Sequence, residues 1–202
     1  GSDGETHQGI FDLSFLSSIP NMTVMAPKNR WELVDMLQYA VTVQAPIAIR
    51  YPRGMAYEGL QEYRSPILYG KGEVLYEEAK TALLPVGSMV ETAIKVREKL
   101  KEEGRQVSIY NARFVKPIDK SLIRSISKKH TVLVTMEENV ASGGFGERVR
   151  AFIQEEGLEL RLVTIAIPDM FVEHGTVEIL KREIRIDEVS ITETIRNLYR
   201  ED

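Results

Sequence analysis

The alternation of short apolar runs with longer amphipathic segments limits the fold of this chain more than any other feature of its sequence. Apolar runs typical of strands lie at residues 23–27, 46–52, 72–77, 81–86, 107–114, 131–136 and 160–167. Segments with a helical spacing of apolar residues lie at 7–19, 28–44, 89–103, 119–128, 144–155, 176–184 and 188–200. Strands that alternate with helices through short connections form parallel sheets. The pattern therefore predicts an α/β fold with a mostly parallel sheet, with room for one antiparallel edge strand.

Residues 55–70 break this alternation and divide the chain. Their sequence, MAYEGLQEYRSPILYG, shows no sustained period and contains Gly and Pro. We interpret them as a linker that lies on a surface between a first region, 1–54, and a second domain, 71–202. The first region supplies two strands and two helices, whereas parallel strands normally lie inside a larger, covered sheet. We therefore expect a missing partner on the N-terminal side of this region.

Composition excludes several classes of function. The chain of 202 residues has a formal net charge of −4 and no long basic run, which argues against a nucleic-acid partner. It contains no Cys, which excludes disulfides, thiolate metal sites and Cys nucleophiles and suits a reducing compartment. No apolar run approaches the roughly 20 residues of a membrane span, so no membrane partner is expected.

The sharpest motif is DGETHQG at residues 3–9. Asp3 and Gly4 predict a tight turn, and Thr6 is a candidate N-cap for the helix that follows. His7 would then project from the first helical turn, where the helix dipole and free N–H groups favour anions. An imidazole so placed can donate to an oxyanion or move a proton near neutral pH. The alternative is a turn-and-cap segment that carries a solvated histidine.

A second motif, RYPRG at residues 50–54, places two arginines at the carboxyl end of a predicted strand. Ligand crevices of open α/β sheets lie at that end, and Arg suits bidentate binding of phosphate or carboxylate. The alternative is a strand end with two solvated charges. EENVASGGFGE at 137–147 lacks the Lys of a phosphate-binding loop, and its carboxylates would repel phosphate, so we interpret it as a tight strand-to-helix connection. No spacing of histidines or carboxylates typical of a metal site is present.

Several long motifs together resemble one enzyme family. DGETHQGIFDLSFLSSIPNMTVMAP, IAIRYPRG, RFVKPID, EENVASGGFGE and IPDMFVEHGT occur in the order and spacing of the 1-deoxy-D-xylulose-5-phosphate synthase family, which belongs to the transketolase-like thiamine-diphosphate enzymes. The resemblance runs from residue 1 to about 200. It implies that residues 1–54 are the C-terminal part of a pyrimidine-binding domain and that residues 71–202 are a transketolase C-terminal domain with a mostly parallel sheet.

The resemblance also implies a reaction. Members of the family condense pyruvate with D-glyceraldehyde 3-phosphate and release CO₂, which supplies isoprenoid, thiamine and pyridoxal biosynthesis. By motif matching, His7 would be catalytic near the reacting carbon, Asp3 would line the substrate channel, and Arg53 would bind the phosphate of the acceptor. Arg50 would share that role or be structural.

The cofactors implied for the full-length enzyme are thiamine diphosphate and Mg²⁺. The GDG…N motif that binds them in the family is absent from this sequence, so we expect the fragment alone to bind neither and to be inactive. No cofactor-binding or metal-binding residue is therefore predicted here.

The partners implied are the missing diphosphate-binding and pyrimidine-binding regions and a second copy in a homodimer. The implied location is the cytoplasm, or a plastid if the source is a plant or alga. Two alternatives stay open: one subunit of a split transketolase-like enzyme, and a free-standing α/β interaction module without catalysis. The joint presence of DGETHQG and RYPRG argues against the second alternative, because a scaffold would not need both.

Overall fold

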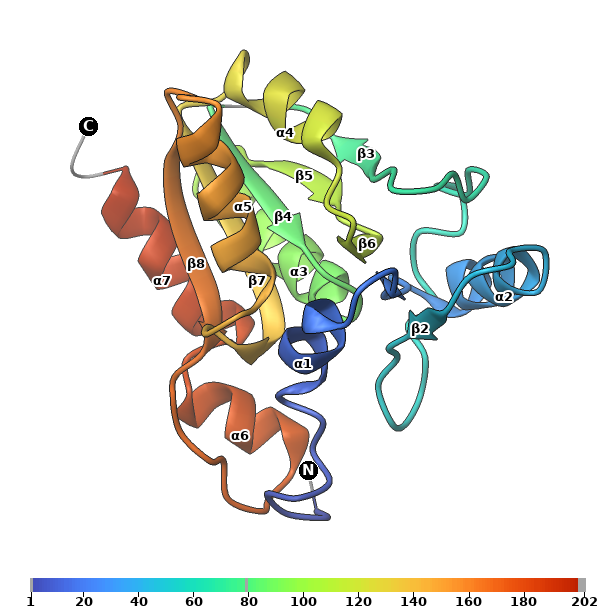
Figure 1. Cartoon of the computed structure of the whole chain (residues 1–202). Coiled ribbons are helices and arrows are strands. Elements are labelled where there is room, and N and C mark those ends of the chain that lie inside the picture. Colours follow the sequence, from blue (N-terminus) through green and yellow to red (C-terminus); the bar gives the residue numbers. More distant parts are fainter. Residues whose placement is uncertain (1, 79, 200–202) are drawn as a thin grey trace.

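The computed structural model describes residues 2–78 and 80–199, and its centre is a five-stranded sheet (Figure 1). The strands are β3 (Glu73–Tyr76), β4 (Thr81–Pro85), β5 (Ser108–Asn111), β7 (Val132–Val140) and β8 (Arg161–Ile167). They lie in the order β3-β5-β4-β7-β8. Strands β5, β4, β7 and β8 run parallel, and β3 pairs antiparallel with β5 at one edge. The predicted mostly parallel sheet with one antiparallel edge strand is confirmed.

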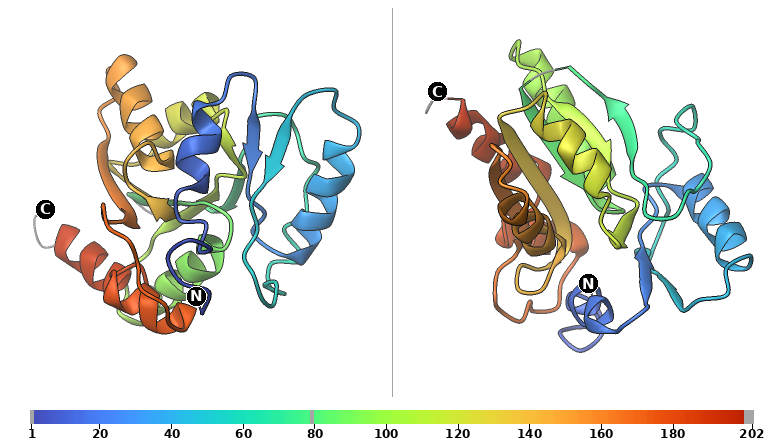
Figure 2. Two further views of the ribbon diagram at one scale, coloured as in Figure 1. Left: turned by 60° about the horizontal axis from the view of Figure 1, so that its bottom comes forward. Right: turned by 45° about the horizontal axis from the view of Figure 1, so that its top comes forward.

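Helices cover both faces of this sheet (Figures 1 and 2). Helices α3 (Met89–Glu102) and α7 (Glu188–Leu198) cover one face, and α4 (Lys120–Ser127) and α5 (Phe145–Glu155) cover the other. Successive residues of a strand point to opposite faces, so Leu83 packs with α3 and α7 while Leu84 packs with α4 and α5. Within the described residues, no helix is both long and apolar enough to cross a membrane.

A second, three-stranded sheet joins the first region to the second domain. Strands β1 (Thr23–Met25) and β2 (Ile47–Ile49) pair in parallel, and the other edge of β1 pairs antiparallel with β6 (Phe114–Lys116). Helix α2 (Arg30–Ala40) connects β1 to β2. The single strand predicted at 107–114 is therefore wrong. Arg113 adopts a φ of 57°, which turns the chain between β5 and β6, and β6 supplies β1 with a neighbour that the sequence had not suggested.

The remaining helices differ from prediction mainly at their ends. Helix α1 (Asp12–Ser18) starts five residues later than the predicted 7–19 helix, and α6 (Val177–Glu183) follows a loop after β8. Strand β7 continues to Val140, beyond the predicted end at 136, and takes in the first residues of the EENVASGGFGE motif. The described residues between β2 and β3 form no helix or strand. Residues 1, 79 and 200–202 of the predicted regions lie outside the described residues.

Candidate active site at the two motif loops

The DGETHQG and RYPRG motifs meet at one cavity of about 330 Å³. Its lining comprises His7, Gln8, Gly9, Asp12, Leu16 and residues 48–53. The RYPRG segment follows β2 directly, so the cavity lies at the carboxyl end of a parallel strand pair. This is the end at which α/β sheets place their ligands. The structure thus brings together two motifs that lie more than 40 residues apart in the sequence.

The DGETHQG segment is a loop, and the prediction that Thr6 caps a helix from residue 7 is wrong. The His7 amide donates to the Gly4 carbonyl at 3.2 Å, and Gly4 has a φ of 80°, which closes a turn that favours glycine. The helix that follows obtains its N-terminal partner from elsewhere, because the Leu13 amide donates to Asn139 Oδ1 at 3.1 Å. His7 therefore lies ahead of α1, and the helix-dipole argument for this residue does not apply.

His7 is exposed at the cavity and is oriented by its neighbour. Its Nδ1 lies 2.8 Å from the Thr6 hydroxyl oxygen. A hydroxyl can donate to the ring or accept from it, so this bond holds the imidazole without fixing its tautomer. A ring held in this way can give up or take a proton at a ligand in the cavity.

Asp3 and Arg53 form an ion pair between the two motif loops. The Arg53 side chain is 79% exposed, and that of Asp3 is 43% exposed. The hydrogen bond and the charge of Arg53 lower the pKa of Asp3, and Asp3 in turn raises the pKa of Arg53. A carboxylate and a phosphate use the same guanidinium donors. An anionic ligand could therefore replace Asp3 on Arg53 or share it.

Arg50 has different surroundings from Arg53, although only two residues separate them. Its side chain is 16% exposed, and its NH2 donates to the Glu138 carbonyl at 3.0 Å. Its NH1 also donates to Glu138 Oε2 at 3.3 Å. Of the two alternatives predicted for Arg50, these contacts favour the structural one.

The EENVASGGFGE segment forms a tight connection from β7 to α5, as predicted. The Glu137 carboxylate accepts from the Phe145 and Gly146 amides, at 2.8 Å each. Burial raises the pKa of Glu137 to about 7, although these two amides act to lower it. A Cβ on Gly144 would lie 2.7 Å from Glu137 Oε2, so the turn needs glycine there. The carboxylate of Glu137 is occupied by the protein and is not offered to a ligand.

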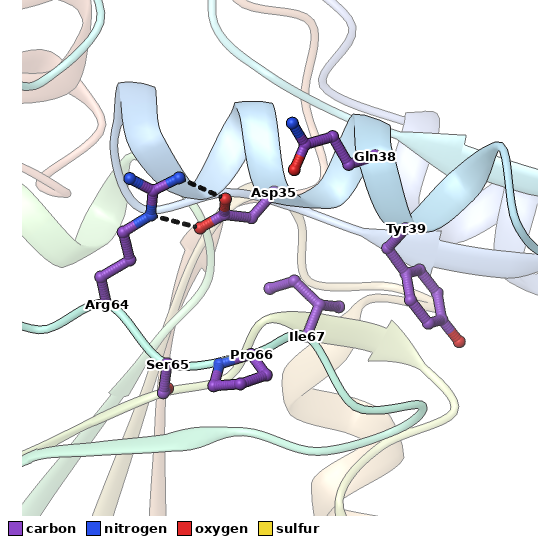
Figure 3. Close-up of a pocket in the computed structure, with 7 residues that line it drawn as sticks. All are labelled: Asp35, Gln38, Tyr39, Arg64, Ser65, Pro66 and Ile67. Atoms are coloured by element: carbon purple, nitrogen blue, oxygen red, sulfur yellow. Dashed lines mark hydrogen bonds and ion pairs between the residues drawn. The ribbon is translucent and has the colours of Figure 1, made fainter.

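A larger cavity of about 520 Å³ lies between α2 and the predicted linker, and none of the predicted site residues lines it (Figure 3). Its lining comprises Asp35, Gln38, Tyr39 and residues 64–67. Arg64 closes one side through two hydrogen bonds to Asp35, at 2.9 and 2.7 Å. In the described part of the chain, no group of three or more His, Cys, Asp or Glu residues could hold a metal ion.

Sequence reasoning missed two residues that position the motif loops. Glu138 holds Arg50, and Asn139 holds the start of α1. Both follow the strand predicted to end at 136 and belong to a motif interpreted as a connection alone. Their polar character at the end of an otherwise apolar strand was the available signal, but the sequence did not indicate which distant residues they contact.

Family models match nearly the whole chain. The model described as "Transketolase, C-terminal domain" matches residues 70–191, and "Transketolase, pyrimidine binding domain" matches residues 1–58. The chain belongs to the transketolase family. The fold class predicted for this transketolase-family chain is therefore confirmed. The predicted domain boundaries at 54 and 70 stay predictions.

Curated relatives of this transketolase-family chain carry the name 1-deoxy-D-xylulose-5-phosphate synthase. The chain is 50% identical over 196 residues to the synthase of Lachnoclostridium phytofermentans, covering 96% of this chain and 31% of the relative. It is 46% identical to a synthase of Clostridium perfringens, covering 98% of this chain and 32% of the relative. The chain thus spans about a third of the length of these relatives. The predicted resemblance to the synthase family is confirmed.

Two solved structures share the fold of this transketolase-family chain. A protein described as "Split gene transketolase, inactive beta4 tetramer" aligns with a TM-score of 0.89 and 24% identity, over 96% of this chain and 63% of that one. The transketolase of Campylobacter jejuni aligns with a TM-score of 0.71 and 19% identity, over 98% of this chain and 29% of that one. At these identities the likeness concerns the fold alone.

Proposed function

We propose that this chain is the C-terminal part of a 1-deoxy-D-xylulose-5-phosphate synthase, a thiamine-diphosphate-dependent transferase of the transketolase type. The full-length protein would join pyruvate to D-glyceraldehyde 3-phosphate with loss of CO₂. The observation that carries the proposal is the meeting of His7 and the exposed Arg53 at one cavity, in a sequence half identical to a synthase. A proton-transfer group beside a phosphate-binding group suits a phosphorylated aldehyde.

The proposal assigns separate roles to the three predicted site residues. Arg53 binds the phosphate of the acceptor through charge-assisted hydrogen bonds. Asp3, which holds Arg53 when no acceptor is bound, orients the guanidinium and faces the acceptor's hydroxyl groups. His7 donates a proton to the aldehyde oxygen of the acceptor as the new carbon–carbon bond forms.

Among the described residues, no group of three or more His, Cys, Asp or Glu could hold a metal ion. In the proposal, residues of the full-length protein outside this chain bind thiamine diphosphate and Mg²⁺. The cofactor supplies the nucleophilic carbon, and this chain supplies the position and charge of the acceptor.

The assembly that we propose follows the predicted divisions of the chain. Residues 1–54 complete a pyrimidine-binding domain whose other part lies N-terminal to them. Residues 55–70 link this domain to the C-terminal domain, which residues 71–202 form. The full-length protein is a cytoplasmic homodimer. A split enzyme is the second candidate, because one structural neighbour is described as a split-gene transketolase. The gene distinguishes the two: upstream sequence that continues in frame into a GDG…N motif supports one long chain.

The test is product formation by the full-length protein. With pyruvate, D-glyceraldehyde 3-phosphate, thiamine diphosphate and Mg²⁺, we expect 1-deoxy-D-xylulose 5-phosphate, identified by mass spectrometry. Reactions without pyruvate or without thiamine diphosphate are the controls and should give none. A folded full-length protein that yields no product under these conditions would contradict the proposal.

A further inference from the structure

Three consecutive residues at the end of β7 each hold a different part of the molecule. Glu137 binds the first amides of α5. Asn139 accepts from the Leu13 amide of α1, and its Nδ2 donates to Ser14 Oγ at 2.7 Å. Glu138, between them, reaches the RYPRG segment through Arg50. The second domain therefore contacts the elements that flank both motif loops.

Glu138 is the shared anion of a small, mostly buried cluster. Its carboxylate forms ion pairs with Arg50 and with Lys181 of α6, and the Ser88 hydroxyl donates to it. The side chains of Arg50, Glu138 and Lys181 are 16%, 14% and 21% exposed. Burial acts to raise the pKa of Glu138, but the charges of Lys181 and Arg50 outweigh it and lower the pKa to about 2. Glu138 is therefore a carboxylate throughout the neutral range.

The cluster fixes one end of the segment that carries Arg53. The Arg50 amide donates to the Met25 carbonyl at 2.8 Å, which ties the end of β2 to β1. In the described part of the chain, the hydrogen bonds that connect residues 50–54 to other segments come from Arg50 and Arg53. Arg50 bonds to Met25 and Glu138, and Arg53 bonds to Asp3. Pro52 restricts the backbone between the two arginines. The position of Arg53 therefore depends on the anchor at Arg50 and on the ion pair with Asp3.

We propose that Glu138 is a positioning residue that holds the phosphate-binding Arg53 in place through Arg50. This inference rests on the proposed function. It gives the second domain a part in acceptor binding, although none of its residues needs to touch the acceptor. When an acceptor takes Arg53 from Asp3, the contact between Arg50 and Glu138 remains as a side-chain anchor of the segment, beside the backbone hydrogen bond from Arg50 to Met25.

Loss of the Glu138 charge would weaken this anchor, because the ion pair with Arg50 is lost while the hydrogen bond from Arg50 to the Glu138 carbonyl remains. In Glu138→Gln, Arg50 and Lys181 lose their shared counter-charge, and residues 50–54 gain freedom that acceptor binding must remove. We expect the KM for D-glyceraldehyde 3-phosphate to rise about tenfold, the effect of weakening one charge-assisted hydrogen bond. The KM for pyruvate and the kcat should stay close to those of the wild type. Unphosphorylated glyceraldehyde should be used as before, because it does not need Arg53.

The experiment is a double-mutant cycle in the full-length protein, made of Glu138→Gln, Arg50→Met and the two combined. If Glu138 acts through Arg50, the combined variant should be no worse than Arg50→Met alone, whereas independent roles would multiply the two effects. Glu156→Gln is the matched control, because Glu156 is an exposed glutamate paired with Arg124, outside the cavity lining. It should leave every kinetic constant unchanged.

Hydrogen exchange gives a readout that does not depend on activity. The Arg50 amide of the full-length protein, which donates to the Met25 carbonyl, should exchange faster in Glu138→Gln than in the wild type, and Glu156→Gln should not change its exchange. If Glu138→Gln does not fold, the Arg50→Lys variant tests the inference instead. It keeps the positive charge but loses the two-point contact with Glu138. The KM for D-glyceraldehyde 3-phosphate and the exchange rate should rise in this variant too, to a smaller degree.

Two results would overturn the inference. One is unchanged exchange of the Arg50 amide in Glu138→Gln. The other is an equal loss with phosphorylated and unphosphorylated acceptors, which would make Glu138 a general structural residue. A wild-type protein that makes no product overturns the proposed function instead, and the exchange data still decide whether Glu138 holds the segment.

Discussion

Arg50 and Arg53 lie on the same short segment, and their partners give them different roles. Arg53 is largely exposed and paired with Asp3, whereas Arg50 is mostly buried against Glu138. A residue that binds a diffusing anion must remain accessible, while a residue that anchors a loop gains from burial. The RYPRG sequence alone could not separate the two arginines, because the distinction depends on Glu138, 88 residues further along the chain.

Arg53→Ala in the full-length protein should impair use of the phosphorylated acceptor. We expect kcat/KM for D-glyceraldehyde 3-phosphate to fall roughly tenfold to hundredfold, as charge-assisted contacts with the phosphate are lost. Unphosphorylated glyceraldehyde should lose much less, and the KM for pyruvate should not change. Steady-state kinetics with both acceptors measure the difference. An equal loss with both would mean that Arg53 supports the fold of the segment.

His7→Ala should behave differently from Arg53→Ala. A group that transfers a proton at the reacting carbon contributes about 10²–10⁴-fold, so kcat should fall with both acceptors. Thr6→Val removes the hydroxyl that orients the imidazole and should have a smaller effect in the same direction. Single-turnover measurements with each acceptor test this. Full activity of His7→Ala would remove His7 from the proposed chemistry.

His130 should make stability depend on pH at a place remote from the site. It is buried, with Nδ1 3.1 Å from the Ile126 carbonyl and Nε2 2.9 Å from the Ser108 hydroxyl, and burial lowers its pKa. A lowered pKa means that the folded state prefers neutral imidazole. The contribution of neutral His130 to the free energy of unfolding is therefore complete above about pH 6.5 and is lost as the pH falls. Glu77 and Lys129 are the nearby charges.

Urea unfolding of the wild type and of His130→Gln between pH 5 and 8 measures this contribution. The difference in unfolding free energy between the two proteins should shrink as the pH falls below 6.5. A constant difference over this range would contradict the expectation.

At the scale of elements, the sequence predicted which helices and strands exist better than it predicted their ends. Periodicity identified the parallel strands and covering helices because these depend on which face of each element is apolar. It failed at the start of α1, which depends on Asn139, and at the division of β5 from β6, which depends on the backbone of Arg113. Both failures occur where one part of the chain contacts another that is far away in sequence.

The pairing of β1 with β6 changes what hydrogen exchange should show. Strand β1 has a neighbour on both sides, whereas β2 lies at the edge of the three-stranded sheet. We expect the amides of β4 and β7, at the centre of the larger sheet, to exchange most slowly, those of β1 next, and those of β2 fastest. Exchange followed by NMR tests the order. Equal protection of β2 and β4 would show that another surface covers the free edge of β2.

At the scale of the whole molecule, a buried network of charges ties the two regions together. Lys28 pairs with Glu32 at 3.0 Å and with Glu73 at 2.6 Å, and Arg113 pairs with the same two carboxylates at 2.7 and 2.9 Å. All four side chains are at most 8% exposed. Arg113 also donates to the Ser65 carbonyl of the predicted linker at 3.2 Å. First region, linker and second domain therefore share one network.

This arrangement could not be predicted from the sequence. RFVKPID at 113–119 contains strand β6 and the N-cap of α4, where Asp119 accepts from the Leu122 amide. Nothing local distinguishes Arg113 from a solvated charge, because Glu32 lies 81 residues away in the sequence and Glu73 lies 40 away. Sequence patterns reveal elements and motifs, whereas the relative placement of the two regions rests on charges that meet only after folding.

Removal of Arg113 should therefore destabilise the chain more than removal of any exposed charged side chain. Arg113→Met leaves Glu32 and Glu73 buried with Lys28 as their shared counter-ion, and breaking such a buried pair costs about 3–5 kcal/mol. Arg64→Met is the matched control: Arg64 makes a two-point contact with Asp35, but its side chain is 50% exposed, so water replaces what is lost. Urea unfolding should shift strongly to lower denaturant for Arg113→Met and hardly for Arg64→Met. Since Arg113 holds the linker and the first region against the second domain, Arg113→Met should also speed hydrogen exchange of the β1 amides. Similar unfolding midpoints for the two variants would mean that packing between the β-sheets and helices, and not this network, holds the two regions together.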